Sequence, residues 1–286
     1  MRAPATSNRP KFLWSRPRCA AAVVSLAIAA VIAVGADRRQ TEPAEGMSIN
    51  APAIDAPFES HALRLPASIR VCTFNIHGGR DAAGRFDLER TAGCLVGYDL
   101  VGLNEVHGAF PWQEGDQAQL LGNKLRLGWL FAPSERRWWN DDFGNGFLCS
   151  LPISGWRRIP LKGTRGKGYR TLVEAQVELG GRTLHTLVTH IDRVTDREEQ
   201  LAAVIDAFLD LPEPAILMGD LNSTADDPLI QQLLNEPGVL DPLRESGAKS
   251  SRKRIDWIFT RGLRPVAAGI TDTGASDHPA VWAELE

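Results

Sequence analysis

The 286 residues are 43% hydrophobic and 23% charged, the composition of an ordinary globular protein. Of the 32 basic and 35 acidic residues, five basic and no acidic ones lie within residues 1–18, which leaves 27 against 35 elsewhere, a net charge near −8. Non-specific nucleic-acid binding depends on many cationic contacts with phosphates, so this charge argues against a bulk nucleic-acid binder. It does not argue against a single phosphate group held by a metal.

The first 36 residues have the pattern of a targeting segment. Residues 1–18 form a basic leader, and an uncharged run of mostly Ala, Val, Ile and Leu follows over residues 19–36. This run is either a signal-peptide core, cleaved after Ala36, or a transmembrane signal anchor. In both cases the leader should stay inside and the rest should be exported. We therefore expect an extracytoplasmic protein that is membrane-anchored, secreted or periplasmic.

Residues 37–68 are rich in Pro, Ala, Glu and Ser and show little periodicity, which predicts a linker. From residue 69 to residue 286 the pattern changes to short apolar runs separated by turn residues, which predicts one folded domain. The runs predicted as strands are Ile69–Phe74, Leu100–Leu103, Gly146–Ser150, Leu172–Leu179, Thr183–Thr189, Ala215–Met218, Ile255–Thr260 and Ala280–Leu285.

Helices are fewer, and they are predicted at Asp87–Leu95, Glu114–Lys124 and Asp196–Leu209. Asp196 and Glu199 have the spacing of a capping box at the start of the last helix. Gly180-Gly181 predicts a tight hairpin between two strands. Hairpins alternating with strands joined by helices predict an α/β (α+β) fold, a four-layer sandwich of two mixed β-sheets packed face to face with helices outside.

Three cysteines remain after the apolar run, and all three lie in apolar surroundings: Cys72, Cys94 and Cys149. An odd number does not form a disulfide framework. Buried thiols are the favoured interpretation, and a single bridge stays open.

Polar residues repeatedly follow the predicted buried strands. In the segment from Ala215 to Asn222, an apolar strand ends at Gly219, and Asp220 and Asn222 then project two positions apart on one side of the chain. Taken alone, this segment could equally be a turn. Asn75 and Glu105 follow other strands in the same way.

Several carboxylates at strand ends are difficult to explain by stability, because each costs several kcal/mol to desolvate unless it is paired or bound to a metal. Oxygen ligands suit Mg²⁺ or Mn²⁺. Zinc is not indicated, because His190 and His278 lie far apart and no Cys/His cluster accompanies them.

The order of these clusters resembles that of the endonuclease/exonuclease/phosphatase superfamily, a group of metal-dependent phosphoester hydrolases that includes deoxyribonuclease-I-like enzymes, neutral sphingomyelinases and inositol-polyphosphate 5-phosphatases. The resemblance covers residues 69–286. It rests on Asn75, Glu105, the strand end at His190, Gly-Asp-Leu-Asn at 219–222, Asp256 within Arg-Ile-Asp-Trp-Ile, and Ser-Asp-His at 276–278.

The resemblance implies a role for each matched residue. Glu105 would be the main metal ligand, and Asn75 and Asp277 would complete the metal shell or form hydrogen bonds with it. Asp220 would orient or deprotonate the attacking water. The metal would neutralise charge that develops on the phosphoryl group.

The remaining roles concern phosphate contact and proton transfer. Asn222 would hold a non-bridging phosphate oxygen, and His190 would donate to the phosphate or protonate the leaving oxygen. His278 would act in proton transfer or charge stabilisation, oriented by Asp256. Asn145 would contact the substrate phosphate, although a simple Asn-Gly turn explains it equally well.

The substrate is left open among a small phosphodiester, a lipid head group and a nucleic acid. Six cations between Arg157 and Arg170, and three at residues 252–254, could bind a polyanion or belong to solvated loops. Trp138-Trp139 could stack on a base or insert into lipid. We expect an exported, monomeric phosphodiesterase that contacts the membrane if the leader is uncleaved. The alternatives are a secreted or membrane-tethered nuclease and a catalytically silent binding module.

Overall fold

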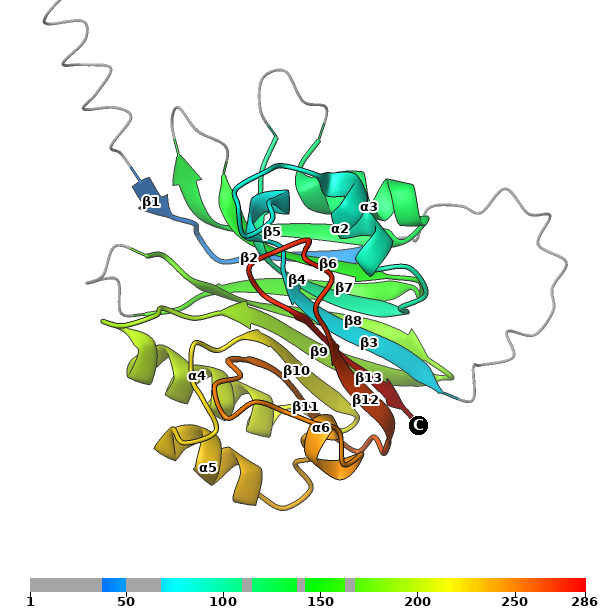
Figure 1. Cartoon of the computed structure of the whole chain (residues 1–286). Coiled ribbons are helices and arrows are strands. Elements are labelled where there is room, and N and C mark those ends of the chain that lie inside the picture. Colours follow the sequence, from blue (N-terminus) through cyan, green and yellow to red (C-terminus); the bar gives the residue numbers. More distant parts are fainter. Residues whose placement is uncertain (1–37, 50–67, 110–114, 138–141, 163–167) are drawn as a thin grey trace, which may run out of the picture.

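The computed structural model describes residues 38–49, 68–109, 115–137, 142–162 and 168–286 (Figure 1). The leader, the apolar run at 19–36 and Trp138-Trp139 lie outside these ranges, so the predictions made for them stay predictions. Within the described ranges, no helix has both the length and the apolar character needed to cross a membrane.

Two β-sheets form the centre of the domain (Figure 1). The first sheet has seven strands in the spatial order β1 (Arg38–Gln40), β5 (Gly128–Arg137), β6 (Phe143–Cys149), β4 (Leu100–His107), β3 (Ile69–Asn75), β13 (Ala280–Leu285) and β12 (Pro265–Thr271). The second has six strands in the order β11 (Asp256–Arg261), β10 (Ala215–Asp220), β9 (Arg182–His190), β8 (Thr171–Leu179), β7 (Ile153–Pro160) and β2 (Ala44–Ile49). Both sheets are mixed, because β3–β4 and β9–β10 are parallel pairs beside antiparallel ones.

Helices cover the outer faces of both sheets. The helices α2 (Leu88–Cys94) and α3 (Gln117–Leu125) lie on the first sheet, and α4 (Arg197–Asp210) and α5 (Pro228–Asn235) lie on the second (Figure 1). A short helix, α6 (Pro242–Glu245), contacts β12 and β11, and a 3-10 turn, η1 (His77–Gly79), follows β3. The predicted four-layer sandwich is therefore confirmed.

Strand alternation divides the apolar side chains among three cores. On β3, Val71 faces the core between the sheets, whereas Cys72 faces the core beneath α2 and α3. On β10, Met218 faces the core between the sheets and Leu217 faces the core beneath α4 and α5. Successive side chains of a strand point to opposite faces, so a strand covered on both sides reads as the continuous apolar run seen in the sequence.

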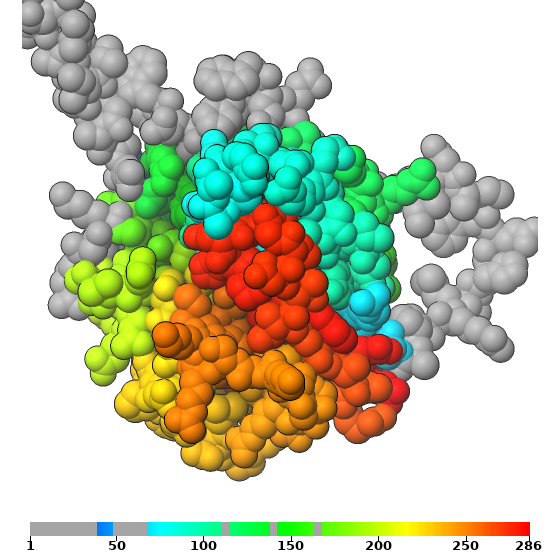
Figure 2. All heavy atoms as spheres, in the orientation of Figure 1, coloured from blue at the N-terminus to red at the C-terminus, as the bar shows by residue number. Residues whose placement is uncertain are grey.

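The C-terminal strand joins distant parts of the chain. β13 pairs antiparallel with β3, so Val281 lies opposite Thr73. Figure 2 shows the C-terminal segment, in red, lying between the N-terminal part of the domain, in cyan, and the orange and yellow segments. This pairing brings the Ser-Asp-His loop before β13 next to the end of β3.

The predicted strands and helices are present, with ends shifted by a few residues. The hairpin at Gly180-Gly181 is confirmed, since both glycines have positive φ and β8 pairs with β9. The capping box is wrong in one respect: Asp196 precedes α4, but its side chain makes no capping hydrogen bond there. The sequence prediction missed β1, β2, β5, β7, β12, α5 and α6.

The linker prediction for residues 37–68 is wrong for residues 38–49, while residues 50–67 lie outside the described ranges. β1 pairs with β5 at the edge of the first sheet, and β2 pairs with β7 at the edge of the second. Between them, the buried Thr41 donates its hydroxyl to Pro133 O at 2.7 Å. These strands are held by backbone pairing rather than by an apolar face, so they leave no hydrophobic period in the sequence.

All three described cysteines are free thiols. Cys72 and Cys149 are buried, and burial raises the pKa of both, that of Cys149 to about 12. Cys94 is half-buried on α2. The prediction of buried thiols therefore holds for two of the three.

Candidate active site

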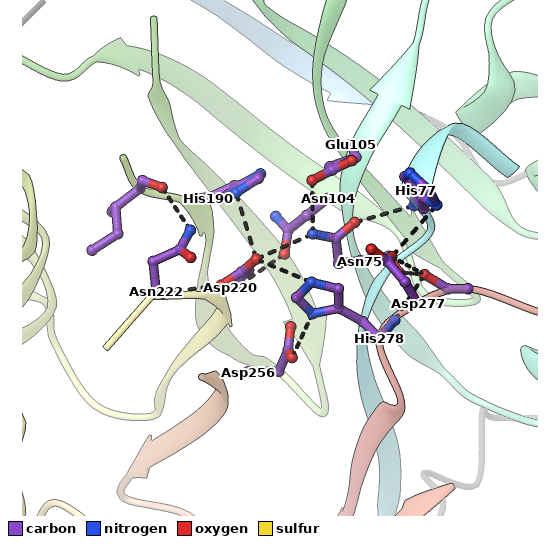
Figure 3. A network of polar contacts seen from close by, with 12 residues as sticks. Asn75, His77, Asn104, Glu105, His190, Asp220, Asn222, Asp256, Asp277 and His278 are labelled. Atoms are coloured by element: carbon purple, nitrogen blue, oxygen red, sulfur yellow. Dashed lines mark hydrogen bonds and ion pairs between the residues drawn. The ribbon is translucent and has the colours of Figure 1, made fainter. Parts of the chain in front are cut away.

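The predicted site residues meet at one end of the sandwich, where strands from both sheets end (Figure 3). Asn75 and Glu105 come from β3 and β4 of the first sheet. His190 and Asp220 end β9 and β10 of the second sheet, and Asp256 begins β11, which is antiparallel to β10. His278 and Asp277 come from the loop before β13. Residues up to 203 positions apart, from Asn75 to His278, are thereby brought together.

Asp220 is the centre of this group. Its Oδ2 atom accepts a hydrogen bond from Asn75 Nδ2 at 3.1 Å. The same oxygen lies 3.5 Å from His190 Nε2 and 3.9 Å from His278 Nε2. The Oδ1 atom accepts a hydrogen bond from the backbone N–H of Asn222 at 2.9 Å. One carboxylate thus contacts four of the predicted residues, and it is only 2% exposed.

The close approach of β10 to β9 explains the glycine before this aspartate. Gly219 has φ +145°, and a Cβ atom there would lie 1.8 Å from the carbonyl oxygen of Thr189. Only glycine fits, because any side chain would meet the backbone of the neighbouring strand. Gly219 therefore lets Asp220 and His190 end their strands side by side, in register.

Asn104 joins the two sheets beneath the site, and the sequence analysis missed it. Its Oδ1 accepts from the backbone N–H of Asp220 at 2.9 Å, and its Nδ2 donates to Thr189 O at 2.9 Å. The side chain is fully buried. The only signal in the sequence is its position beside Glu105 at the end of a strand. Its bonds fix the ends of β9 and β10 relative to β4, so Asn104 is a positioning residue.

Asn145 is less accessible than predicted. It is 1% exposed, its Oδ1 accepts from Asn104 Nδ2 at 2.9 Å, and its Nδ2 donates to Thr171 O at 3.0 Å. Both polar atoms are satisfied inside the protein, so contact with substrate would require these bonds to break. The surroundings of Asn145 favour a structural role.

Strained backbone is concentrated in the site. Among the described residues, four that are not glycine have positive φ, and three of them lie here: His77 at 49°, Glu105 at 58° and Asn222 at 45°. Glu105 also falls where the β4–β6 register shifts, at a bulge that turns its side chain out of the strand pattern. Such conformations cost about 1–3 kcal/mol each and persist where the surrounding structure enforces them, commonly at functional sites.

Burial sets the protonation of the acidic residues. It raises the pKa of Asp220 to about 7, with a further contribution from the charge of Asp256. Burial also raises the pKa of Asp256, against the lowering effect of its hydrogen bond with His278. Burial alone would lower the pKa of His278, but the hydrogen bond that its Nδ1 donates to Asp256 at 2.8 Å and the nearby carboxylates raise it to about 9. Near neutral pH, Asp220 is therefore partly deprotonated and able to accept a proton, and it lies beside the protonated imidazole of His278.

His190 is in the opposite state. Burial lowers its pKa well below the usual range, and the neighbouring charge of Arg170 adds to the effect. Arg170 Nη1 lies 3.3 Å from His190 Nδ1. Because a guanidinium only donates, Nδ1 must accept, and Nε2 then carries the hydrogen that faces Asp220. His190 is therefore a neutral donor, which fits donation to a phosphate better than protonation of a leaving oxygen.

Arg170 is the second functional residue that sequence reasoning missed, because it appeared there only as one of six cations in a loop. It is a partly buried cation, and desolvation lowers its pKa. Of the other cations, Arg157 pairs with Glu174, and Arg254 pairs with the buried Asp241 at 2.6 Å. Those two arginines serve the fold.

Oxygen donors that could hold a divalent cation line the first-sheet side of the site. Asn75 Nδ2 donates to Glu105 Oε1 at 3.1 Å. Ser276 Oγ links Asn75 O, at 2.7 Å, to Asp277 Oδ1, at 3.2 Å. The chemistry of these carboxylate and amide oxygens fits Mg²⁺ or Mn²⁺. His77 Nδ1 lies 3.5 Å from Asp277 Oδ1 and joins this group, although the sequence analysis did not single it out.

A second group of possible ligands exists on the other side. Donor atoms of Asp220, Asp256 and His278 lie within 4.8 Å of one another. Nδ1 of His278 is already hydrogen-bonded to Asp256. This group can therefore transfer protons, while the oxygen atoms around Glu105 could hold a divalent cation.

Comparison with known proteins agrees with this geometry. A family model described as the endonuclease/exonuclease/phosphatase family matches residues 72–278. A search of curated proteins finds no significant match.

Several solved structures resemble the domain. An endonuclease/exonuclease/phosphatase from Beutenbergia cavernae DSM 12333 is 26% identical with a TM-score of 0.62, and the match covers 77% of this chain and 71% of that chain. A family protein from Leptotrichia buccalis C-1013-b is 17% identical with a TM-score of 0.62, over 76% and 99% of the two chains. D. rerio TDP2 complexed with single-strand DNA product is 18% identical with a TM-score of 0.55, over 77% and 100%. The last two likenesses concern the fold alone.

Proposed function

Because the chain belongs to the endonuclease/exonuclease/phosphatase family, we propose that it is a divalent-metal-dependent phosphodiesterase. The observation that carries the proposal is the surroundings of Asp220. A buried carboxylate with a pKa of about 7 lies within 4 Å of a neutral histidine and a protonated one. A general base is most effective when its pKa is close to the working pH.

In the proposed reaction, Asp220 takes a proton from the attacking water. His278 enters protonated, stabilises charge on the phosphoryl oxygens and supplies the proton that the leaving oxygen needs. Asp256 holds Nδ1 of His278, so that Nε2 faces the reacting group. His190 donates from Nε2 to a phosphoryl oxygen, and Arg170 fixes that tautomer. Asn222 holds Asp220 through its backbone N–H.

Glu105, Asn75 and Asp277 would hold Mg²⁺ or Mn²⁺. When bound, the cation would neutralise charge on the phosphoryl group and help to orient it. The strained backbone of Glu105 supports this role, since it directs a carboxylate toward Asn75 at the cost of an unfavourable conformation.

We also propose that residues 19–36 direct the domain out of the cytoplasm. The support is the five cations of the leader followed by 18 uncharged, mostly apolar residues. Fractionation of cells that express the untagged chain tests this proposal. Recovery of the protein from the soluble cytoplasm would contradict it.

Hydrolysis assays on the purified full chain test the function. The substrates are plasmid DNA, RNA, sphingomyelin, phosphoinositides and a chromogenic phosphodiester, each with Mg²⁺ or with EDTA. We expect metal-dependent cleavage of the small or lipid diesters. Cleavage of plasmid would indicate a nuclease instead. Inactivity on every substrate would favour a silent binding module and contradict the proposal.

A further inference from the structure

A cavity lined by four arginines lies where the edges of the two sheets meet, beside β1. Its volume is about 550 Å³, and its charged lining residues are Arg39, Arg136, Arg137, Arg158, Glu42 and Asp142. Among these described residues, four cations face two acids. We call this feature the arginine cavity. Half of its lining residues, 39–42, lie in the segment that was predicted to be a linker.

The strand pairing forces like charges together in this cavity. β1 places Arg39 directly opposite Arg136 on β5, and like charges in directly opposed positions destabilise a sheet. Arg158 approaches from the other sheet, and its pKa is lowered mainly by burial and then by the charge of Arg136. Asp142 lies 3.6 Å from Arg136, and Glu135 pairs with Arg137 at 2.9 Å. Arg158 donates to Glu42 O at 2.8 and 3.1 Å. The cavity lining still carries more cations than acids, which suits an anion.

Contacts within the first sheet join the arginine cavity to the metal side of the active site. The guanidinium of Arg137 lies 5.1 Å from the centre of the Phe143 ring. Phe143 packs edge-on against His107, with ring centres 5.5 Å apart. His107 follows Glu105 by two residues on β4. Because β4 and β5 both run antiparallel to β6, Arg137 and Glu105 lie at the same end of the first sheet.

A second connection runs through the other sheet. Gln40, next to Arg39 on β1, donates its side-chain amide to Leu161 O at 2.7 Å. The N–H of Leu161 donates to Arg170 O at 2.9 Å, and Arg170 contacts His190. A substrate held at the catalytic residues could therefore extend along this rim toward the cavity.

We propose that the arginine cavity binds a phosphate group of the substrate other than the one that is hydrolysed. The proposal rests on the proposed function and deepens it, because it defines the substrate class: a compact phosphodiester that carries at least one further phosphate. Arginine is suited to this role, since its planar group bonds two phosphate oxygens at once. The acidic balance of the domain makes a long nucleic acid the less favoured ligand.

A binding measurement tests the cavity without turnover. Thermal unfolding of the full chain is followed at low salt in EDTA, with and without inorganic pyrophosphate. The test variant is Arg39→Gln/Arg136→Gln, in which both replaced side chains are exposed. The control is Arg182→Gln, which removes one exposed cation at the β8–β9 hairpin, the far end of β9 from His190.

We expect pyrophosphate to raise the Tm of the wild type and of the control by at least about 2 °C. The double variant should show less than half of that shift. Without pyrophosphate its Tm should change little, because both replaced side chains are exposed. If the double variant unfolds early, Arg136→Gln alone is measured instead. Equal shifts in all variants would overturn the proposal.

A kinetic measurement tests the substrate class. Glycerophosphoinositol and glycerophosphoinositol 4,5-bisphosphate are both phosphodiesters and differ only in added phosphates. The quantity compared is kcat/KM for the bisphosphate divided by kcat/KM for glycerophosphoinositol. We expect this ratio to fall about tenfold in the double variant, mainly because the KM for the bisphosphate rises. In Arg182→Gln the ratio should keep its wild-type value. A ratio that does not change would overturn the proposal. Failure to hydrolyse either compound would count against the proposed function instead, because the thermal shift needs no turnover.

Discussion

Replacing Asp220 by asparagine should remove activity and at the same time make the metal-free protein more stable at pH 8. The pKa of Asp220 is raised by burial to about 7, above its ordinary value of 3.8. The contribution of protonated Asp220 to the free energy of unfolding is fully present below pH 3.8 and is lost as the pH rises through 7. At pH 8 the wild type therefore holds a buried, unfavourable charge, and asparagine does not.

The magnitude follows from the pKa. A rise of about three units at 1.36 kcal/mol each corresponds to about 4 kcal/mol as an upper limit. Two losses reduce the gain. An asparagine can accept from only one of the two donors now bonded to the carboxylate, the Asn222 N–H and Asn75 Nδ2, which costs about 1 kcal/mol. His278 also loses a favourable neighbouring charge. We expect a net gain of about 2 kcal/mol.

Urea unfolding in EDTA at pH 5 and pH 8 measures this effect. The matched control is Asp206→Asn, which replaces an exposed aspartate on α4 and should change stability by less than about 0.5 kcal/mol. Turnover with Mg²⁺ should fall at least about a hundredfold in Asp220→Asn and should not change in the control. If Asp220→Asn gains no stability at pH 8 relative to pH 5, burial is not what raises the pKa of this group, and the reasoning fails.

Three further results are expected. The value of kcat/KM should rise with pH near pH 7, where Asp220 loses its proton, and fall near pH 9, where His278 loses its proton. A profile without the rise near pH 7 would mean that Asp220 is not the base. Arg170→Met should raise the pKa of His190 in an NMR titration, because it removes a neighbouring positive charge, and should lower kcat about tenfold. An unchanged pKa of His190 would mean that Arg170 does not act on the imidazole. Gly219→Ala should lower the free energy of unfolding, measured in urea, by about 3 kcal/mol, because its Cβ would meet the backbone of the neighbouring strand. A decrease in the free energy of unfolding below about 1 kcal/mol would contradict that contact.

The types and the order of the site residues were evident in the sequence. Buried strands leave continuous apolar runs, so the polar residues at their ends, such as Asp220 and His190, stood out along the chain. The glycine before Asp220 indicated a tight strand exit, and the structure shows the close backbone contact that requires it. Local patterns of this kind depend on neighbours in the sequence, so the sequence alone contained them.

Contacts between distant residues were decided only by the tertiary structure. Asn104 joins sheets whose strands lie 85 and 116 positions away, and nothing near it in the sequence shows its partners. Arg170 appeared as a loop cation, yet its contact with Nδ1 of His190 determines which ring nitrogen of that histidine carries the hydrogen. β1 lacks an apolar pattern because backbone hydrogen bonds hold it, and its pairing with β5 brings Arg39 into the arginine cavity. Burial and distance through space set the charges of such groups, and neither is a property of the linear chain.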